Sequence, residues 1–249
     1  PQELERERTV VIQEIGQAHD TPDDRVFDHF QMAAFPDQAL GRPVLGCIET
    51  VGNMPRETVM GHMRASYGGD RMVLSAAGNL DHDEIVAMAE RLFDSIPEIG
   101  HFEMEPGTYV GGAHLEDRDL EQVHLLLGFP GISYENDQFY ATSVMSALLG
   151  GGMSSRLFQE VREKRGLVYS IYSYPAFYRD CGLFGIYAGT GPPDVDELLP
   201  VICEEILRLP SSLSDEEIER ARTQLKAATL MSLESTGSRC EQMAQQMLI

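Results

Sequence analysis

A short stretch that occurs twice constrains the fold of this chain more than any other feature. Residues 3–14 read E-L-E-R-E-R-T-V-V-I-Q-E, and residues 217–228 read E-I-E-R-A-R-T-Q-L-K-A-A. Five of the twelve positions are identical, and Leu4 is replaced by the similar Ile218. Internal similarity of this kind indicates that one structural unit occurs more than once. We therefore expect two related domains that share this helix.

The two copies differ at two acidic positions. Glu7 and Glu14 of the first copy are replaced by Ala221 and Ala228 in the second. The glutamates are seven residues apart, which on an α-helix places both carboxylates on nearly the same face. A single glutamate is usually a solvated surface group, because acids are seldom buried without a partner. Since a repeat preserves what the scaffold needs, acids present in only one copy are candidates for chemistry.

The length and charge of the chain limit its class. Its 249 residues, of which 43% are hydrophobic, are enough for two globular domains with cores of their own. The 19 basic and 40 acidic residues give a net charge of −21, which argues against nucleic acid or an anionic membrane as partner and favours cationic peptides. No apolar run approaches the length of a membrane span.

The cysteines and the first residue bear on compartment and completeness. The four cysteines form no C-x-x-C pair, so we interpret them as reduced thiols of an intracellular protein rather than as disulfides or a zinc knuckle. The chain begins with Pro1 and not with methionine, so we expect it to be a fragment of a longer protein.

Apolar periodicity and turn residues predict an α+β chain. The pattern predicts a linker over residues 97–112. Strands are expected at residues 72–77, 123–129, 167–174 and 182–188. Helices are expected over residues 3–14, 22–34, 55–67, 81–93, 137–148 and 155–166, from Asp194 onward with Pro200 kinking the helix or shifting its start, and from Ser214 onward.

The neighbours of Glu14 suggest a metal. Apolar residues surround it in sequence, so we expect it at the edge of a core, where a carboxylate needs a cation. Zinc accepts carboxylate oxygen in sites that histidines complete. The seven histidines include no pair at i, i+4, and neither H-E-x-x-H nor H-x-x-E-H occurs. The sequence therefore predicts that this chain cannot build a zinc site alone.

A second candidate site lies in residues 150–174, G-G-G-M-S-S-R-L-F-Q-E-V-R-E-K-R-G-L-V-Y-S-I-Y-S-Y. Four cations, Arg156, Arg162, Lys164 and Arg165, precede Tyr169 on a predicted strand. A phosphate loop is excluded, because no G-x-x-x-x-G-K-[ST] motif is present. Two interpretations stay open here. From charge alone this is a helix with a solvated basic face, whereas an arginine with a tyrosine hydroxyl can hold a peptide carbonyl or its oxyanion.

The stretch from Leu148 to Ser170 resembles the second domain of the pitrilysin/insulinase family of zinc peptidases. The resemblance is to the short-chain branch typified by mitochondrial processing peptidase and its bacterial homologues. The segments E-R-E-R-T-V-V-I-Q-E-I, V-F-D-H-F and G-R-P-V-L-G-C-I-E-T-V resemble the first domain. The resemblance implies duplicated α+β domains, each a mainly antiparallel sheet packed with helices. Residues 1–103 would be the C-terminal part of the first, zinc-binding domain, and residues 104–249 most of the homologous substrate-binding domain.

The same resemblance implies roles for four residues. The family is an inverzincin family, in which two histidines of H-x-x-E-H bind Zn2+ and the glutamate is the general base. Glu14 matches the downstream glutamate that is the third zinc ligand, and Glu7 matches an acidic residue that orients the site. Arg162 and Tyr169 match a substrate-binding pair that faces the zinc of the other half of a clam-like chamber. The H-x-x-E-H motif, with its general base, is expected upstream of Pro1.

The function this implies is zinc-dependent metalloendopeptidase activity on unstructured peptides, by attack of metal-activated water, with one Zn2+ per active site. This fragment alone should be inactive. A homodimer or a paired homologous subunit is implied as partner, and the negative charge favours basic peptides. The bacterial cytoplasm is the expected location, with the mitochondrial matrix as the alternative. The rival hypotheses are a non-catalytic subunit or assembly partner of the same family and a peptide-binding scaffold that acts through its β edges.

Overall fold

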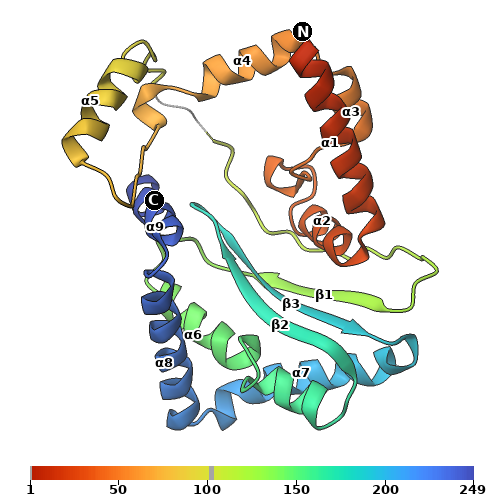
Figure 1. The fold of residues 1–249 in the computed structure, drawn as a ribbon. Helices are drawn as coiled ribbons and strands as arrows, with labels where there is room; N and C mark the ends of the chain where they lie inside the picture. The colour runs from red at the N-terminus through yellow and green to blue at the C-terminus, as the bar shows by residue number, and fades with distance from the viewer. Residues whose placement is uncertain (1, 101–103) are drawn as a thin grey trace. The chain divides into compact units, whose positions relative to one another are not determined.

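The computed structural model describes residues 2–100 and 104–249 (Figure 1). Its elements are α-helices with one three-stranded antiparallel sheet, which confirms the predicted α+β class. The chain divides into two compact units. We call the described residues of 1–12, 47–104 and 227–249 the helical unit, and residues 13–46 and 105–226 the sheet unit.

The helical unit contains no strand among its described residues. It comprises α3 (Ile48–Asn53), α4 (Arg56–Ser66), the 3-10 turn η2 (Gly69–Arg71), α5 (His82–Phe93) and α9 (Thr236–Leu248). Two long helices have residues in both units, namely α1 (Gln2–Asp20) and α8 (Asp215–Ser232). Across the described residues, no helix combines the length and the apolar character that crossing a membrane requires.

The sheet unit carries the three strands, in the order β1-β3-β2. The strands are β1 (Val123–Pro130), β2 (Val168–Phe177) and β3 (Gly182–Thr190). Its helical elements are α2 (Pro22–Ala34), η1 (Ala39–Gly41), α6 (Phe139–Gly150), η3 (Phe158–Glu163), η4 (Pro192–Asp194) and α7 (Val195–Ser212).

The central strand β3 organises the core of the sheet unit. All of its residues are buried, so apolar side chains are needed on both of its faces. On one face Phe184, Ile186 and Ala188 pack with side chains of η3, α6 and α7, including Val161, Leu149, Leu198 and Ile202. Figure 1 shows α6 and α7 along this face of the sheet.

The other face of β3 is covered by α2. Leu183 packs with Ala34 and with the fully buried Phe35, the residue that follows α2. Farther along the sheet, the ring of Phe27 stacks on Tyr187 at 5.6 Å between centroids. These contacts explain why the strands at residues 123–129, 167–174 and 182–188 are confirmed. Their C-terminal ends extend one to three residues farther than expected, and β2 begins one residue later.

The predicted helix starts depend on their capping residues. The Asp81 carboxylate accepts from the Glu84 N–H at 3.1 Å, and Ser214 forms a reciprocal capping box with Glu217. The helices expected from residues 81 and 214 are confirmed, and each begins one residue later, after its capping residue. The helix expected from residue 137 begins at Phe139, with Gln138 and not Asp137 at the N-cap position.

Two other sequence expectations are also corrected. Residues 72–77 form no strand, and Met72 and Leu74 are half exposed. A short apolar segment becomes a stable strand only when another strand pairs with it, and none of the three described strands does. Pro200 lies inside α7, so it does not shift the start of that helix. The predicted linker has neither helix nor strand in its described residues, while the predicted domain boundary at residue 103 lies outside the described residues.

The internal repeat is confirmed as a structural feature. Both copies are helical, the first in α1 and the second in α8. The same ion pair also recurs, since Arg8 contacts Glu5 at 3.3 Å and Arg222 contacts Glu219 at 2.6 Å. The repeated residues therefore specify the same local structure twice.

A half-buried ion pair, which we call the clamp, joins α8 to the segment before η3. The Arg156 guanidinium donates to both oxygens of Glu217, at 2.7 and 2.9 Å, and also bonds Ser212. These hydrogen bonds from Arg156 lower the pKa of Glu217 from an ordinary 4.5 to about 2. The clamp therefore stabilises the fold while Glu217 is ionised.

This clamp predicts a pH-dependent stability. Because the folded-state pKa is depressed, the stabilisation is complete above about pH 4.5 and is lost as the pH falls toward 2. We expect Glu217→Gln to lower the free energy of unfolding by about 2 kcal/mol at pH 7, and by less as the pH falls through that window. Urea unfolding followed by circular dichroism at several pH values measures this difference.

Glu219→Gln is the matched control, because Glu219 lies on the same helix in an exposed ion pair. Its effect should stay below about 0.5 kcal/mol at every pH. A Glu217→Gln difference that is the same at pH 7 and pH 2 would contradict the role of the clamp.

Candidate functional site

The structure brings Arg162 and Tyr169 together. Arg162 comes from η3, which is a π-helical turn, and Tyr169 lies near the start of β2. The Arg162 Cζ atom lies 5.8 Å from the centroid of the Tyr169 ring and 4.8 Å from that of Phe158. The guanidinium thus contacts two aromatic rings, at distances typical of cation–π attraction. Turns of the π-helix type are rare and are often found at functional sites.

The side-chain nitrogens of Arg162 are not used by the described fold. Its side chain is half-buried, and no described residue gives it a hydrogen bond or an ion pair. Tyr169 is 74% exposed. The N–H groups of a guanidinium lie in its plane, so ring contacts leave these donors available. The arrangement presents hydrogen-bond donors beside an exposed phenol.

The other three cations of this stretch are all paired. Arg156 binds Glu217, Lys164 binds Glu160, and Arg165 contacts Glu197 at 3.4 Å. Lys164 and Arg165 are exposed and fit the interpretation of a solvated basic face, whereas Arg156 is largely covered. Arg162 departs from that interpretation, and charge alone does not separate it from its neighbours, whereas the family resemblance does. Phe158 contacts the Arg162 guanidinium and was not predicted from the sequence. Its i, i+4 spacing to Arg162 is a signal that could have identified it.

Glu7 and Glu14 both lie on α1, and both are exposed. The helix contributes no buried residue, so the expectation that Glu14 sits at the edge of a core is wrong for the described structure. Even the neighbouring Val10 is 40% exposed. No described residue bonds either carboxylate, and both remain available to a ligand or to another part of the protein.

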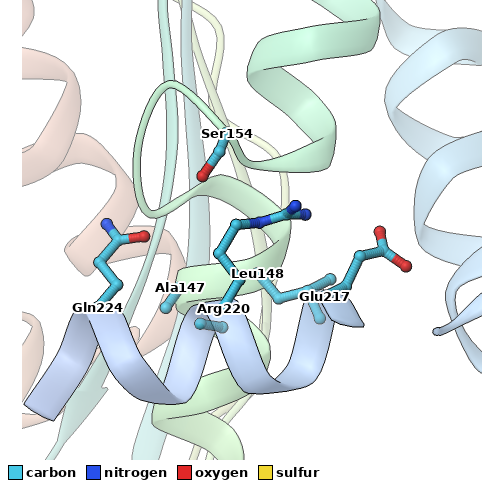
Figure 2. Close-up of a pocket in the computed structure, with 7 residues that line it drawn as sticks. Ala147, Leu148, Ser154, Glu217, Arg220 and Gln224 are labelled. Carbon is cyan, nitrogen blue, oxygen red and sulfur yellow. The ribbon is translucent and has the colours of Figure 1, made fainter. Parts of the chain in front are cut away.

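The second copy of the helix shows why one acid has no counterpart there. Ala221, which matches Glu7, is 3% exposed and faces α6. A cavity of only about 10 Å³ remains beside it, roughly one water molecule in size. Figure 2 shows this contact between α8 and α6, which is lined by Ala147, Leu148, Ser154, Glu217, Arg220, Ala221 and Gln224. Because a glutamate does not fit here, the loss of this acid has a packing cause in the second copy. Ala228, which matches Glu14, is exposed, so packing does not explain its replacement.

The described residues do not complete a metal site. They contain no group of three or more histidine, cysteine, aspartate or glutamate side chains that could hold a metal ion. A carboxylate such as that of Glu14 is a suitable zinc donor, yet it supplies one ligand of the four that zinc commonly takes. Any zinc site that includes Glu14 therefore needs ligands from outside the described residues.

Comparison with known proteins identifies the family. The model described as the peptidase M16 inactive domain matches residues 53–225. A relative from Rickettsia bellii, named an uncharacterized zinc protease, is 41% identical over 242 residues, which cover 97% of this chain and 59% of the relative. The chain thus spans a little over half the length of such relatives.

Solved structures share the fold. A chain of complex III from Candida albicans matches with a TM-score of 0.88 and 23% identity, covering 98% of this chain and 60% of that one. The peptidase M16 inactive domain from Pseudomonas fluorescens matches with a TM-score of 0.84 and 20% identity, covering 100% and 60%. Together with the family model, which covers most of the sequence, these matches show that the chain belongs to the peptidase M16 family, as its resemblance to the pitrilysin/insulinase peptidases predicted.

Proposed function

We propose that the protein containing this chain is a zinc-dependent metalloendopeptidase of unstructured peptides, and that this chain supplies substrate-binding groups to it. The observation that carries the proposal is the guanidinium of Arg162, which is held against two aromatic rings while its donors remain unpaired within the described chain. A half-buried arginine without a partner in its own fold is suited to an external acceptor. The names of the relatives as zinc proteases support the reaction class.

The chemistry of the pair suits a peptide backbone. A guanidinium donates short, charge-assisted hydrogen bonds to carbonyl or carboxylate oxygen. The Tyr169 hydroxyl can donate to the same oxygen or to the next one along the peptide. Donors that are fixed before binding stabilise the negative charge that develops on a carbonyl under attack. Contact with Phe158 and Tyr169 limits the motion of Arg162 and so reduces the entropy lost on binding.

The metal part of the proposal rests on Glu14. We assign it as one zinc ligand and Glu7 as the acid that supports it, with the other ligands supplied from outside the described residues. A bound zinc ion would supply a nucleophilic water at neutral pH and polarise the scissile carbonyl. The exposure of both glutamates on α1 is compatible with this assignment.

The proposal includes a partner. The remaining half of the site would come from a second copy of the protein or from a homologous subunit. The net charge of −21 favours basic peptides through long-range attraction. The bacterial relatives are compatible with the predicted cytoplasmic location, which stays a prediction.

One observation favours a second candidate function. The matching family model describes an inactive domain, which is what a non-catalytic subunit or assembly partner would contain. The two candidates differ in whether the full-length protein binds zinc and cleaves peptides.

Replacing the proposed zinc ligand tests the metal assignment. We expect Glu14→Gln in the full-length protein to reduce zinc affinity and peptidase rate by at least about 10- to 100-fold, the range seen when even a supporting residue is lost. Metal analysis after dialysis and cleavage of a fluorogenic peptide measure both. Glu3→Gln, an exposed acid on the same helix, is the control and should change neither. Unchanged zinc content in Glu14→Gln refutes the assignment, and a wild-type protein without zinc or activity supports the non-catalytic alternative.

Replacing the arginine tests the substrate-binding assignment. We expect Arg162→Ala to raise KM for peptides by about 10- to 100-fold, because a hydrogen bond to a charged group contributes roughly 1.5–3 kcal/mol. Arg162→Lys should recover only part of this loss, because lysine cannot present a planar donor array. Arg165→Ala removes a cation from the same segment, where it pairs with Glu197, and should leave KM within about twofold. Equal effects of the two alanine variants would show that only bulk charge matters.

A further inference from the structure

We propose that the buried Thr190 is a positioning residue for Arg162 and Tyr169, an inference that rests on the proposed function. Thr190 ends β3, whereas the pair it would control lies on η3 and β2. Nothing in its sequence surroundings marks it as part of a site. Its assignment comes from the hydrogen bonds that fix the turn between Arg162 and Tyr169.

The first half of this turn is fixed by a glycine. The Gly166 N–H donates to Arg162 O at 3.0 Å, and the Leu167 N–H donates to Val161 O at 3.1 Å. Gly166 has a φ of +67°, and its bond to the carbonyl four residues earlier is that of an αL C-cap, which ends the helical turn carrying Arg162. The position of Arg162 relative to Leu167 is thereby set.

The second half is fixed by Thr190. Its Oγ1 donates to Leu167 O at 2.6 Å, and its contact with Gly191 O, at 3.5 Å, is too long to compete. Thr190 is 2% exposed and Leu167 is also buried, so water does not replace this bond. The carbonyl of Leu167 is therefore tied to the central strand of the sheet.

The same strand end determines where Tyr169 points. Thr190 is paired in register with Val168, while Gly189 is paired with Ser170. Tyr169 is the extra residue of the resulting bulge, so its side chain is directed away from the regular alternation of β2. A bulge often re-aims a side chain, and here the ring reaches Arg162. Tethering Leu167 beside this bulge holds the phenol and the guanidinium at a fixed separation.

Thr190→Val tests this role, because valine keeps the shape and removes the hydroxyl. In the full-length protein we expect Thr190→Val to raise KM for peptides about tenfold and to leave kcat within about twofold. Thr190→Ser keeps the hydroxyl and should have the wild-type KM. The effect must act through Arg162. In an Arg162→Ala background, Thr190→Val should therefore change KM by less than about twofold, which is the non-additivity expected of coupled residues.

Ser173→Ala is the matched control for stability. Ser173 lies on β2, is buried, and donates to Ser146 O at 2.9 Å, so its loss removes the same type of bond without touching the turn. We expect this variant to lower the thermal midpoint and to leave KM unchanged. If Thr190→Val and Ser173→Ala raise KM equally, Thr190 has only a structural role and the inference is overturned.

A readout without activity separates this inference from the proposed function. Amide hydrogen exchange at residues 166–169 should be at least about tenfold faster in Thr190→Val than in Ser173→Ala, because only the former releases the turn. Equal exchange overturns the positioning role whatever the kinetics show. If exchange changes as expected but Arg162→Ala leaves KM unaltered, the proposed substrate-binding role fails and the positioning of the pair stands.

Discussion

The burial of β3 on both faces is the constraint on which the sheet unit depends. A central strand without an exposed face must receive apolar side chains from two directions, and here α6, η3 and α7 supply one layer while α2 supplies the other. Because the strand is enclosed, its pairing with β1 and β2 is held in one register apart from the bulge at Tyr169. Groups at the ends of β3 are consequently fixed in space. The hydrogen bond from Thr190 to the Leu167 carbonyl holds the adjoining turn against this fixed strand.

Arg156 and Arg162 differ in whether the fold satisfies the hydrogen-bond donors of their side chains. The Arg156 guanidinium is ion-paired with Glu217. The Arg162 guanidinium contacts aromatic rings and has no polar partner among the described residues. The first arrangement lowers the pKa of a carboxylate and stabilises the fold. The second leaves donors ready for an external acceptor. Two arginines six residues apart thus have different physical roles, which depend on the surroundings that the fold provides.

The repeated helix shows how a shared scaffold accommodates different tasks. The Glu5–Arg8 ion pair and its counterpart Glu219–Arg222 recur, since each joins two residues three positions apart on one helix. The residue at the position of Glu7 and Ala221 differs between the copies because tertiary contacts restrict its size in the second copy. In the second copy the helix packs closely on α6, and only a small side chain fits there. Replacement of Glu7 by Ala221 has a packing cause, so it is weak evidence for a chemical role of Glu7. Replacement of Glu14 by the exposed Ala228 has no such cause and is stronger evidence for a role of Glu14.

Features that depend on neighbouring residues could be predicted from the amino-acid sequence. Local patterns predict the helix starts next to Asp81 and Ser214, the three strands of the sheet unit and the family. The burial of apolar stretches could not be predicted in this way, because it depends on contacts between residues far apart in the chain. A strand at residues 72–77 and a covered α1 both require such partners. The same holds for the site. Its residues could be named from a motif, whereas the pairing state of Arg162 and the tether from Thr190 arise from contacts across the sheet.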